Sequence, residues 1–127
     1  MSNEKKPVQI LDAPRFAKWV RKARVTTAVE RLTAELQGNP MLGNVIPGYG
    51  SLRKVRMAGA GRGKRGGFRV VYTLLIDSTL LVLLDGYSKS DKEDLSANEL
   101  AALVARAAAV EAEVRAADAA TPQSSEE

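Results

Sequence analysis

The sequence predicts an α+β fold: a small antiparallel sheet, made of a short first strand plus three consecutive antiparallel strands, with two N-terminal helices and a C-terminal helix. Two long apolar runs in its second half, FRVVYTLLI and TLLVLLDGY, predict central strands that are covered on most of both faces. Segments with apolar residues at helical spacing lie before and after the three strands. A length of 127 residues and 45% hydrophobic content suit about one domain with its own core.

A short strand and a first helix are expected at the start. The apolar run VQIL, from Val8 to Leu11, predicts the strand. Asp12 and Pro14 then predict a helix start, because Asp caps free backbone amides and Pro suits the first helical turn. The apolar stripe of this helix is expected in the core rather than at a ligand site, and it consists of Phe16, Trp19, Val20 and Ala23.

A second helix completes the N-terminal helical hairpin. The residues Thr27-Ala28-Val29-Glu30 have the form of a capping box, which predicts that the helix begins there. Gly38 and Pro40 end it. Its buried stripe is expected to be Val29, Leu32 and Leu36. The following segment GNPMLGNVIPGYG is rich in Gly, Pro and Asn, which favours an ordered crossover.

Three strands follow the crossover. In SLRKVRM, alternation places Lys54 and Arg56 on one face and Val55 on the other. The loop AGAGRGKRGG is too rich in glycine to be regular. Asp77 and Ser78 predict a tight hairpin turn between the two long apolar runs.

A final helix is expected after the last strand. Ser96-Ala97-Asn98-Glu99 has the form of a capping box, and the alanine-rich stretch behind it has high helix propensity to about Ala117. We therefore expect a single domain over residues 1–120, with its core in about residues 8–105, and a disordered tail over residues 121–127. The apolar stripe of this helix is expected to be Leu100, Leu103, Val104, Ala107 and Val110.

The distribution of charge favours an anionic partner. Between Leu36 and Ile76 the chain has no Asp or Glu, although the net charge is only +4. Like charges that repel one another are usually kept for phosphate or nucleic acid, and the alternative is a solvated basic hairpin. The basic residues of this segment are Arg53, Lys54, Arg56, Arg62, Lys64, Arg65 and Arg69.

Composition and motifs exclude several other classes. The chain has no Cys and no His, which excludes disulfides and makes a zinc site implausible, so we expect no metal and no cofactor. No apolar run approaches the roughly 20 residues of a membrane span, and MSNEKKP lacks the apolar core of a signal peptide, so we expect a cytoplasmic protein without membrane contact. The loop GAGRGKRGG has neither the dinucleotide-binding spacing nor the Walker spacing, and it leads into a strand rather than a helix.

Five polar residues on the last three strands are candidates for chemistry. If these strands are consecutive and antiparallel, Lys54, Arg56, Arg69, Tyr87 and Lys89 converge on one surface, although a glycine bulge would shift the alternation. Such a cluster suits cleavage of an RNA phosphodiester by its own 2′-hydroxyl. Arginine holds phosphate oxygens, a crowded lysine exchanges a proton, and tyrosine stacks on a base or passes a proton.

Each candidate has a structural alternative. Arg69 lies inside an apolar run, so it can instead form a buried ion pair with Asp85 or Asp94. Tyr72 is expected to be a core aromatic residue, and the acidic segment SDKEDL is expected to supply a turn and a helix cap. The loop cations are expected to hold a nucleic-acid backbone rather than to catalyse.

Two motifs resemble the RelE/ParE superfamily of bacterial toxins, particularly its HigB-like branch. They are GYGSLRKVRMAGAGRGKRGGFRVVY and LLDGYSKSDKEDLSANEL, and the similarity extends over roughly residues 8–105. The resemblance implies a RelE-like fold and a ribosome-dependent mRNA endonuclease. It also implies a cognate antitoxin, often with a helix-turn-helix domain, through which operator DNA is bound.

The resemblance also implies roles for individual residues. Lys54, Arg56 and Arg69 match the positions that contact the scissile phosphate, and Lys89 matches the lysine at the end of the last strand. In RelE itself an arginine follows that lysine and a tyrosine lies on the C-terminal segment, whereas Ser90 and Ser96 stand at those positions here. Without His, the general acid and base are expected among Tyr87 and Lys89. Binding of RNA and the ribosome is expected from Arg53, Arg62, Lys64 and Arg65.

The sequence therefore predicts the toxin of a type II toxin–antitoxin system, an mRNA interferase that acts on the 70S ribosome without metal. One alternative is a gyrase-poisoning toxin of the ParE kind, which has the same fold but generally lacks the basic set. The other is a non-catalytic basic module that binds RNA or an acidic antitoxin segment.

Overall fold

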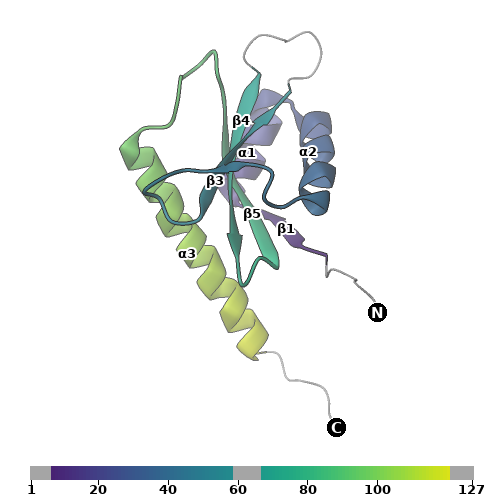
Figure 1. Cartoon of the computed structure of the whole chain (residues 1–127), viewed down its shortest axis with the longest axis vertical. Coiled ribbons are helices and arrows are strands. Elements are labelled where there is room, and N and C mark those ends of the chain that lie inside the picture. Colours follow the sequence, from purple (N-terminus) through teal and green to yellow (C-terminus); the bar gives the residue numbers. More distant parts are fainter. Residues whose placement is uncertain (1–6, 59–66, 121–127) are drawn as a thin grey trace.

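A five-stranded sheet with the order β1-β5-β4-β3-β2 organises the fold, and three helices cover it (Figure 1). The computed structural model describes residues 7–58 and 67–120. In chain order its elements are β1 (Gln9–Asp12), α1 (Pro14–Ala23), α2 (Thr26–Gly38), β2 (Asn44–Val45), β3 (Leu52–Met57), β4 (Phe68–Leu75), β5 (Leu80–Ser88) and α3 (Ala97–Ala120).

The sheet is mixed, which corrects the prediction of an antiparallel sheet. β2, β3, β4 and β5 are antiparallel to their neighbours, but β1 runs parallel to β5, with Gln9 opposite Leu80. A parallel pair needs a long crossover connection, and the chain between β1 and β5 supplies it. A short apolar run such as VQIL suits either direction, so the sequence does not specify which one it takes.

The predicted crossover after α2 contains an edge strand. β2 is only two residues long and pairs with β3, with Asn44 opposite Lys54 and Val45 opposite Arg53. Two residues are too few for an alternating pattern, and for that reason the sequence did not reveal the strand.

Two predicted N-caps are wrong. Asp12 is the last residue of β1, and Ala13 is the N-cap of α1 without a side-chain hydrogen bond, although Pro14 does occupy the first turn as expected. α2 begins at Thr26 with Val25 as its N-cap, again without a side-chain hydrogen bond, so the predicted capping box at Thr27 does not form. The residues at the two N-cap positions, Ala13 and Val25, are apolar and buried.

The third predicted cap is confirmed. The Glu99 amide donates to Ser96 Oγ at 3.1 Å, and the Ser96 amide donates to Glu99 Oε1 at 2.8 Å. These two bonds satisfy backbone donors that the first turn of α3 would otherwise leave unpaired. α3 then runs to Ala120, three residues beyond the predicted end near Ala117.

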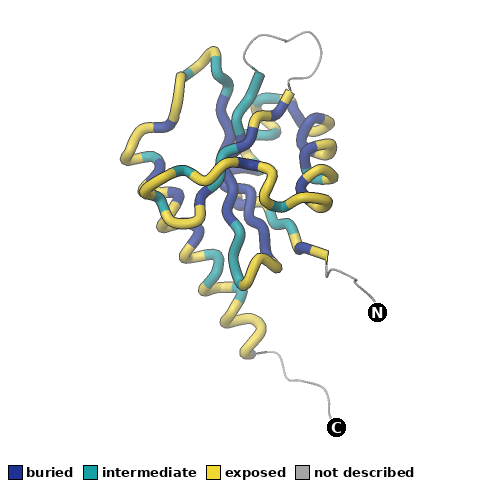
Figure 2. The backbone as a smooth tube through the Cα atoms, in the orientation of Figure 1, coloured by how far each residue is buried: buried dark blue, intermediate teal, exposed yellow. Residues whose placement is uncertain are grey.

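The sheet separates two hydrophobic clusters. Figure 2 shows that buried residues, in dark blue, concentrate along the central strands. On one side, which we call the α1/α2 face, strand residues such as Val55, Val70 and Tyr72 pack on the helical hairpin through Phe16, Leu32 and other apolar residues. On the other side, which we call the α3 face, Leu52, Val71, Val82 and Leu84 pack on α3. The predicted stripes are largely confirmed: Phe16, Val29, Leu32, Leu36, Leu100, Leu103 and Ala107 are buried, and Trp19, Val20, Ala23 and Val110 pack against the clusters, whereas Val104 is 37% exposed.

The hairpin between β4 and β5 is longer than predicted. Leu75 pairs with Leu80, which leaves a four-residue connection rather than the two-residue turn at Asp77 and Ser78. Ile76, Asp77 and Ser78 all have positive φ, and the Thr79 amide closes the turn on the Ile76 carbonyl. Within residues 7–58 and 67–120, no helix has the length and apolarity that crossing a membrane requires. The tail expected to be disordered lies outside the described residues.

Candidate active site

A β-bulge decides which side of the sheet Tyr87 occupies. Between β4 and β5 the register shifts, so that Tyr72 lies opposite Leu83 and Val71 lies opposite Asp85. Leu84 is the additional residue, and it belongs to the cluster on the α3 face. Under strict alternation Tyr87 would point to the opposite side, but the bulge returns it to the α3 face.

Four of the five predicted catalytic residues share the α3 face. Arg56 lies opposite Arg69, and Arg69 lies opposite Tyr87, so these three form one row across β3, β4 and β5. Lys54 lies two residues from Arg56 on β3, in the next row. Alternation places it on the same face as Leu52 and Arg56. The structure therefore brings Lys54, Arg56, Arg69 and Tyr87 together.

Asp94 joins this group from the loop before α3. Lys54 Nζ lies 3.2 Å from both Oδ1 and Oδ2 of Asp94, and Tyr87 Oη donates to Asp94 Oδ1 at 3.1 Å. The Leu95 amide also donates to Asp94 Oδ1 at 2.9 Å and fixes the carboxylate. The Asp94 side chain is 59% exposed, so its contribution to stability is small and it remains accessible to a substrate.

The pKa values of Tyr87 and Asp94 are shifted in opposite directions. Burial, together with the hydrogen bond and negative charge of Asp94, raises the pKa of Tyr87 to about 12, although the positive charge of Arg69 acts in the opposite direction. Partial burial favours a higher pKa for Asp94, but hydrogen bonds from the Leu95 amide, Lys54 and Tyr87 outweigh it and hold the pKa below its usual range. At neutral pH the site therefore contains a phenol and a carboxylate.

The sequence named Asp94 only as an alternative ion-pair partner of Arg69, not as a member of the catalytic group. It is one of three acids in SDKEDL, which was expected to form a turn and a cap. No spacing rule distinguishes Asp94 from Asp91 or Glu93. The distinguishing contacts are with Lys54 and Tyr87, forty and seven residues away along the chain.

The other predicted site residues have different positions. Lys89 follows β5, and its amide donates to the Gly67 carbonyl at 3.2 Å, so its backbone lies beside the start of β4. Arg53 lies on the α1/α2 face by alternation, and its Nη1 donates to the Gly43 carbonyl at 2.6 Å. Arg53 is thus separated from the group on the α3 face. Arg62, Lys64 and Arg65 lie outside the described residues.

The structural alternatives have mixed outcomes. Asp85 pairs with Arg15 at 2.9 Å and Asp94 pairs with Lys54 at 3.2 Å, so each of the two candidate carboxylates has another cation beside it. Arg69 Nη1 donates to the Phe68 carbonyl at 3.5 Å. Tyr72 is a fully buried core residue, as predicted, and its Oη donates to the Pro40 carbonyl and accepts from the Gly43 amide.

The donor groups suit an anion rather than a metal ion. Among the described residues, no three Asp or Glu side chains gather in a way that could hold a metal. Two arginines and a lysine on one face instead provide N–H donors for the oxygens of a phosphate.

The chain matches the family described as "RelE toxin of RelE / RelB toxin-antitoxin system" over residues 8–121. The protein belongs to this family.

Solved structures show the same fold. A mutant of the Escherichia coli toxin RelE in the free state is 16% identical, with a TM-score of 0.53, and the match covers 69% of this chain and 90% of that chain. The toxin–antitoxin complex RelBE2 from Mycobacterium tuberculosis contains a chain that is 18% identical, with a TM-score of 0.50 and coverage of 71% and 100%. An archaeal RelE–RelB complex from Pyrococcus horikoshii gives 13% identity, a TM-score of 0.50 and coverage of 68% and 100%.

Proposed function

We propose that the protein is a ribosome-dependent mRNA endonuclease, of the HigB-like branch, that acts in the cytoplasm and needs no metal. The observation that carries the proposal is the row formed by Arg56, Arg69 and Tyr87, with Lys54 beside it, on a single face of the sheet. Family membership supports an RNA-cleaving toxin, and the row supplies groups for that chemistry.

The cations are proposed to stabilise the reacting phosphate. When the 2′-oxygen attacks phosphorus, the phosphorane gains negative charge, and Lys54, Arg56 and Arg69 can donate hydrogen bonds to its oxygens. Preorganised donors of this kind are the largest source of rate enhancement in many enzymes, about 100- to 1,000-fold for a single donor. The bond to the 5′-oxygen then breaks and leaves a 2′,3′-cyclic phosphate.

Tyr87 and Asp94 are proposed to carry the proton away from the 2′-hydroxyl. An ionised carboxylate only accepts hydrogen bonds, so the phenol hydrogen of Tyr87 points towards Asp94 Oδ1. The phenol oxygen of Tyr87 can therefore accept a second hydrogen bond, from the 2′-hydroxyl. The 2′ proton passes to Tyr87 Oη as the phenol proton passes to Asp94. This transfer avoids a free phenolate, which the raised pKa of Tyr87 disfavours. Lys89 is proposed to protonate the leaving 5′-oxygen.

The test of the function is Arg69→Ala in a translation extract programmed with a defined message. We expect loss of message cleavage and of growth inhibition in cells, because the variant lacks one of the phosphate donors. Arg31→Ala is the matched control, because it removes an exposed arginine from α2 and should cleave as the wild type does. Cleavage that survives Arg69→Ala would contradict the catalytic assignment.

The gyrase-poisoning alternative has a different readout. It predicts trapped cleavage of DNA on gyrase with the message left intact, and this outcome would replace the proposed function. A third outcome, salt-sensitive RNA binding without cleavage on translating ribosomes, would identify a non-catalytic binding module.

We also propose that a cognate antitoxin neutralises the protein. The complexes from Mycobacterium tuberculosis and Pyrococcus horikoshii contain such partners, which supports the same arrangement here. Operator DNA would be bound through a helix-turn-helix domain of the antitoxin. Co-expression with the neighbouring reading frame, followed by purification of the pair, tests this proposal.

A further inference from the structure

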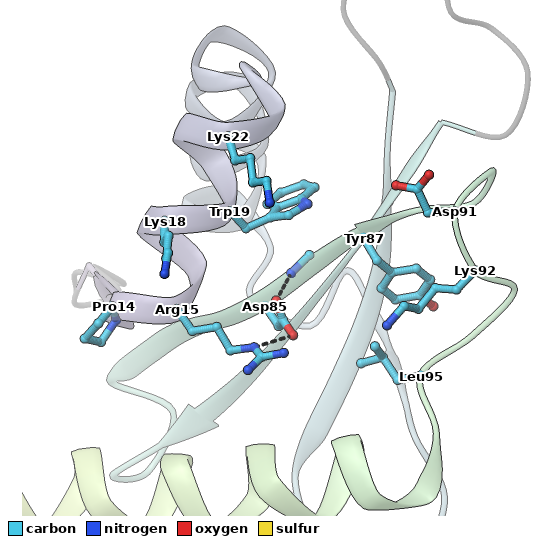
Figure 3. Close-up of a pocket in the computed structure, with 11 residues that line it drawn as sticks. Pro14, Arg15, Lys18, Trp19, Lys22, Asp85, Tyr87, Asp91, Lys92 and Leu95 are labelled. Atoms are coloured by element: carbon cyan, nitrogen blue, oxygen red, sulfur yellow. Dashed lines mark hydrogen bonds and ion pairs between the residues drawn. The ribbon is translucent and has the colours of Figure 1, made fainter.

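A cavity of about 610 Å³ lies beside the candidate active site, between α1 and the loop that precedes α3 (Figure 3). β5 passes between its two walls and contributes Asp85, Gly86 and Tyr87. Because Tyr87 also belongs to the row with Arg56 and Arg69, the cavity and the candidate active site share a side chain. We call it the α1 cavity, and its other lining residues are Pro14, Arg15, Lys18, Trp19, Lys22, Asp91, Lys92 and Leu95.

Two cations of the α1 cavity have no acidic partner in the described part of the chain. Arg15 pairs with Asp85 and Lys92 pairs with Glu99, at 2.9 Å and 2.7 Å. Among the described residues, no carboxylate lies within ion-pair distance of Lys18 or Lys22. These lysines are one helical turn apart on α1, where like charges repel, so an anion between them would relieve the repulsion.

The cavity also offers aromatic surface and a hydrogen-bond acceptor. Trp19 lies on one side and Tyr87 on the other. The Trp19 ring lies directly against Gly86, since a Cβ at that position would overlap it. The Asp91 side chain is exposed, and a carboxylate in this position can accept from the amino group of a base.

We propose that the α1 cavity binds one nucleotide of the message, next to the scissile phosphate, with its phosphate between Lys18 and Lys22 and its base against the aromatic wall. This inference rests on the proposed function and names a further part of its substrate site. An acidic peptide would also satisfy the lysines, but it would bring no planar group to Trp19 and few donors to Asp91. A single-stranded nucleotide supplies a phosphate for the two lysines, a planar base for Trp19 and an amino-group donor for Asp91.

The fluorescence of Trp19 tests the binding directly, because it is the only tryptophan in the chain. We expect a trinucleotide RNA to quench it in a saturable way at concentrations up to about 1 mM, in the wild type and in Arg69→Ala. Lys18→Gln/Lys22→Gln should weaken the binding about tenfold or more, whereas Arg21→Gln should bind as the wild type does. Arg21→Gln is a matched control, because this substitution removes an exposed cation of α1 that does not line the cavity.

Three outcomes of the titration would overturn the inference. They are an absence of saturable quenching, equal quenching in the double lysine variant, and stronger quenching by a polyglutamate peptide than by RNA, which would assign the cavity to an acidic protein segment. None of them depends on cleavage, because the catalytic variant Arg69→Ala is included. The inference and the proposed function can therefore fail separately.

Mapping of cut sites distinguishes messenger from ribosomal RNA. If the cavity holds a nucleotide of the message, the double lysine variant should redistribute the cuts while its affinity for ribosomes without message is unchanged. A loss of affinity for such ribosomes, with an unchanged distribution of cuts, would place ribosomal RNA in the cavity and overturn the inference.

Discussion

At the residue scale, Asp94 links two groups that the proposed reaction needs. Its carboxylate lies 3.2 Å from Lys54 Nζ and accepts from Tyr87 Oη at 3.1 Å. A carboxylate near a phosphate site has an electrostatic cost, since it repels the substrate. A role in proton transfer explains why the site would contain one.

Asp94→Asn should lower the pKa of Tyr87 from about 12 towards its ordinary value of 10.0, because the negative charge that disfavours the phenolate is removed while burial remains. The sign follows from the charged form: Tyr87 becomes negative on deprotonation, so a neighbouring anion raises its pKa. The difference in phenolate absorbance between each protein and its Tyr87→Phe derivative measures the pKa during an alkaline titration.

Asp94→Asn should also reduce message cleavage about 100-fold, which is typical of the loss of a general base. Glu93→Gln is the matched control, because it neutralises an exposed neighbouring acid and should leave both the pKa and the cleavage rate unchanged. If Asp94→Asn cleaves as fast as Glu93→Gln, the carboxylate has no part in the proton transfer.

Gly86 is a second residue with a specific steric role. Gly86→Ala should lower the free energy of unfolding by about 1–3 kcal/mol, because the added methyl group overlaps the Trp19 ring and displaces it. Urea unfolding measures the change, and the emission of Trp19 reports the displacement. Gly38→Ala serves as the control, because an added Cβ meets no atom within 4 Å there. Equal stability of Gly86→Ala and the wild type would mean that Trp19 moves at no cost.

At the scale of elements, the three helices begin in two different ways. α3 begins with reciprocal side-chain and backbone bonds between Ser96 and Glu99, whereas α1 and α2 begin at the buried residues Ala13 and Val25 without such bonds. The motif at Thr27 has the same residue types as a capping box. A sequence motif of this length is therefore insufficient unless the preceding backbone adopts the extended geometry of an N-cap.

The two motifs predict different responses to mutation. Ser96→Ala should lower the free energy of unfolding by about 1 kcal/mol, because it removes the acceptor for the Glu99 amide. Thr27→Ala should change it by less than about 0.5 kcal/mol, because α2 has no side-chain cap to lose. Chemical denaturation of both variants makes the comparison, and a similar loss in each would contradict the caps described for α2 and α3.

At the scale of the whole molecule, the sequence predicted the helices and the three long strands because their patterns are long and periodic. It did not predict the direction of β1 or the pairing of β2, since these depend on contacts far apart in the chain. The site shows the same division. Alternation along β3 correctly predicted that Lys54 and Arg56 share a face. The position of Tyr87 depends on the bulge at Leu84, and that of Asp94 depends on the tertiary fold.

The two-sided sheet also predicts how the molecule unfolds. β4 and β5 bury residues alternately on both faces, with Val70 and Leu83 on the α1/α2 face and Val71 and Val82 on the α3 face. Detachment of α3 would expose the second set to water, at a cost of about 25 cal/mol for each Å² of apolar surface. The helices on opposite faces are therefore coupled through the strands between them.

Unfolding in urea should consequently be a single transition. The emission of Trp19 reports on the α1/α2 face, and far-ultraviolet circular dichroism is dominated by helices, of which α3 is the longest at 24 residues. The two signals should give the same midpoint, as expected for a two-state domain of this size. Leu103→Ala, which removes a buried side chain from α3, should shift both midpoints together, even though Trp19 packs on the other side of the sheet. If the circular dichroism signal were lost at lower urea than the fluorescence change, α3 would unfold independently and the coupling through β4 and β5 would be refuted.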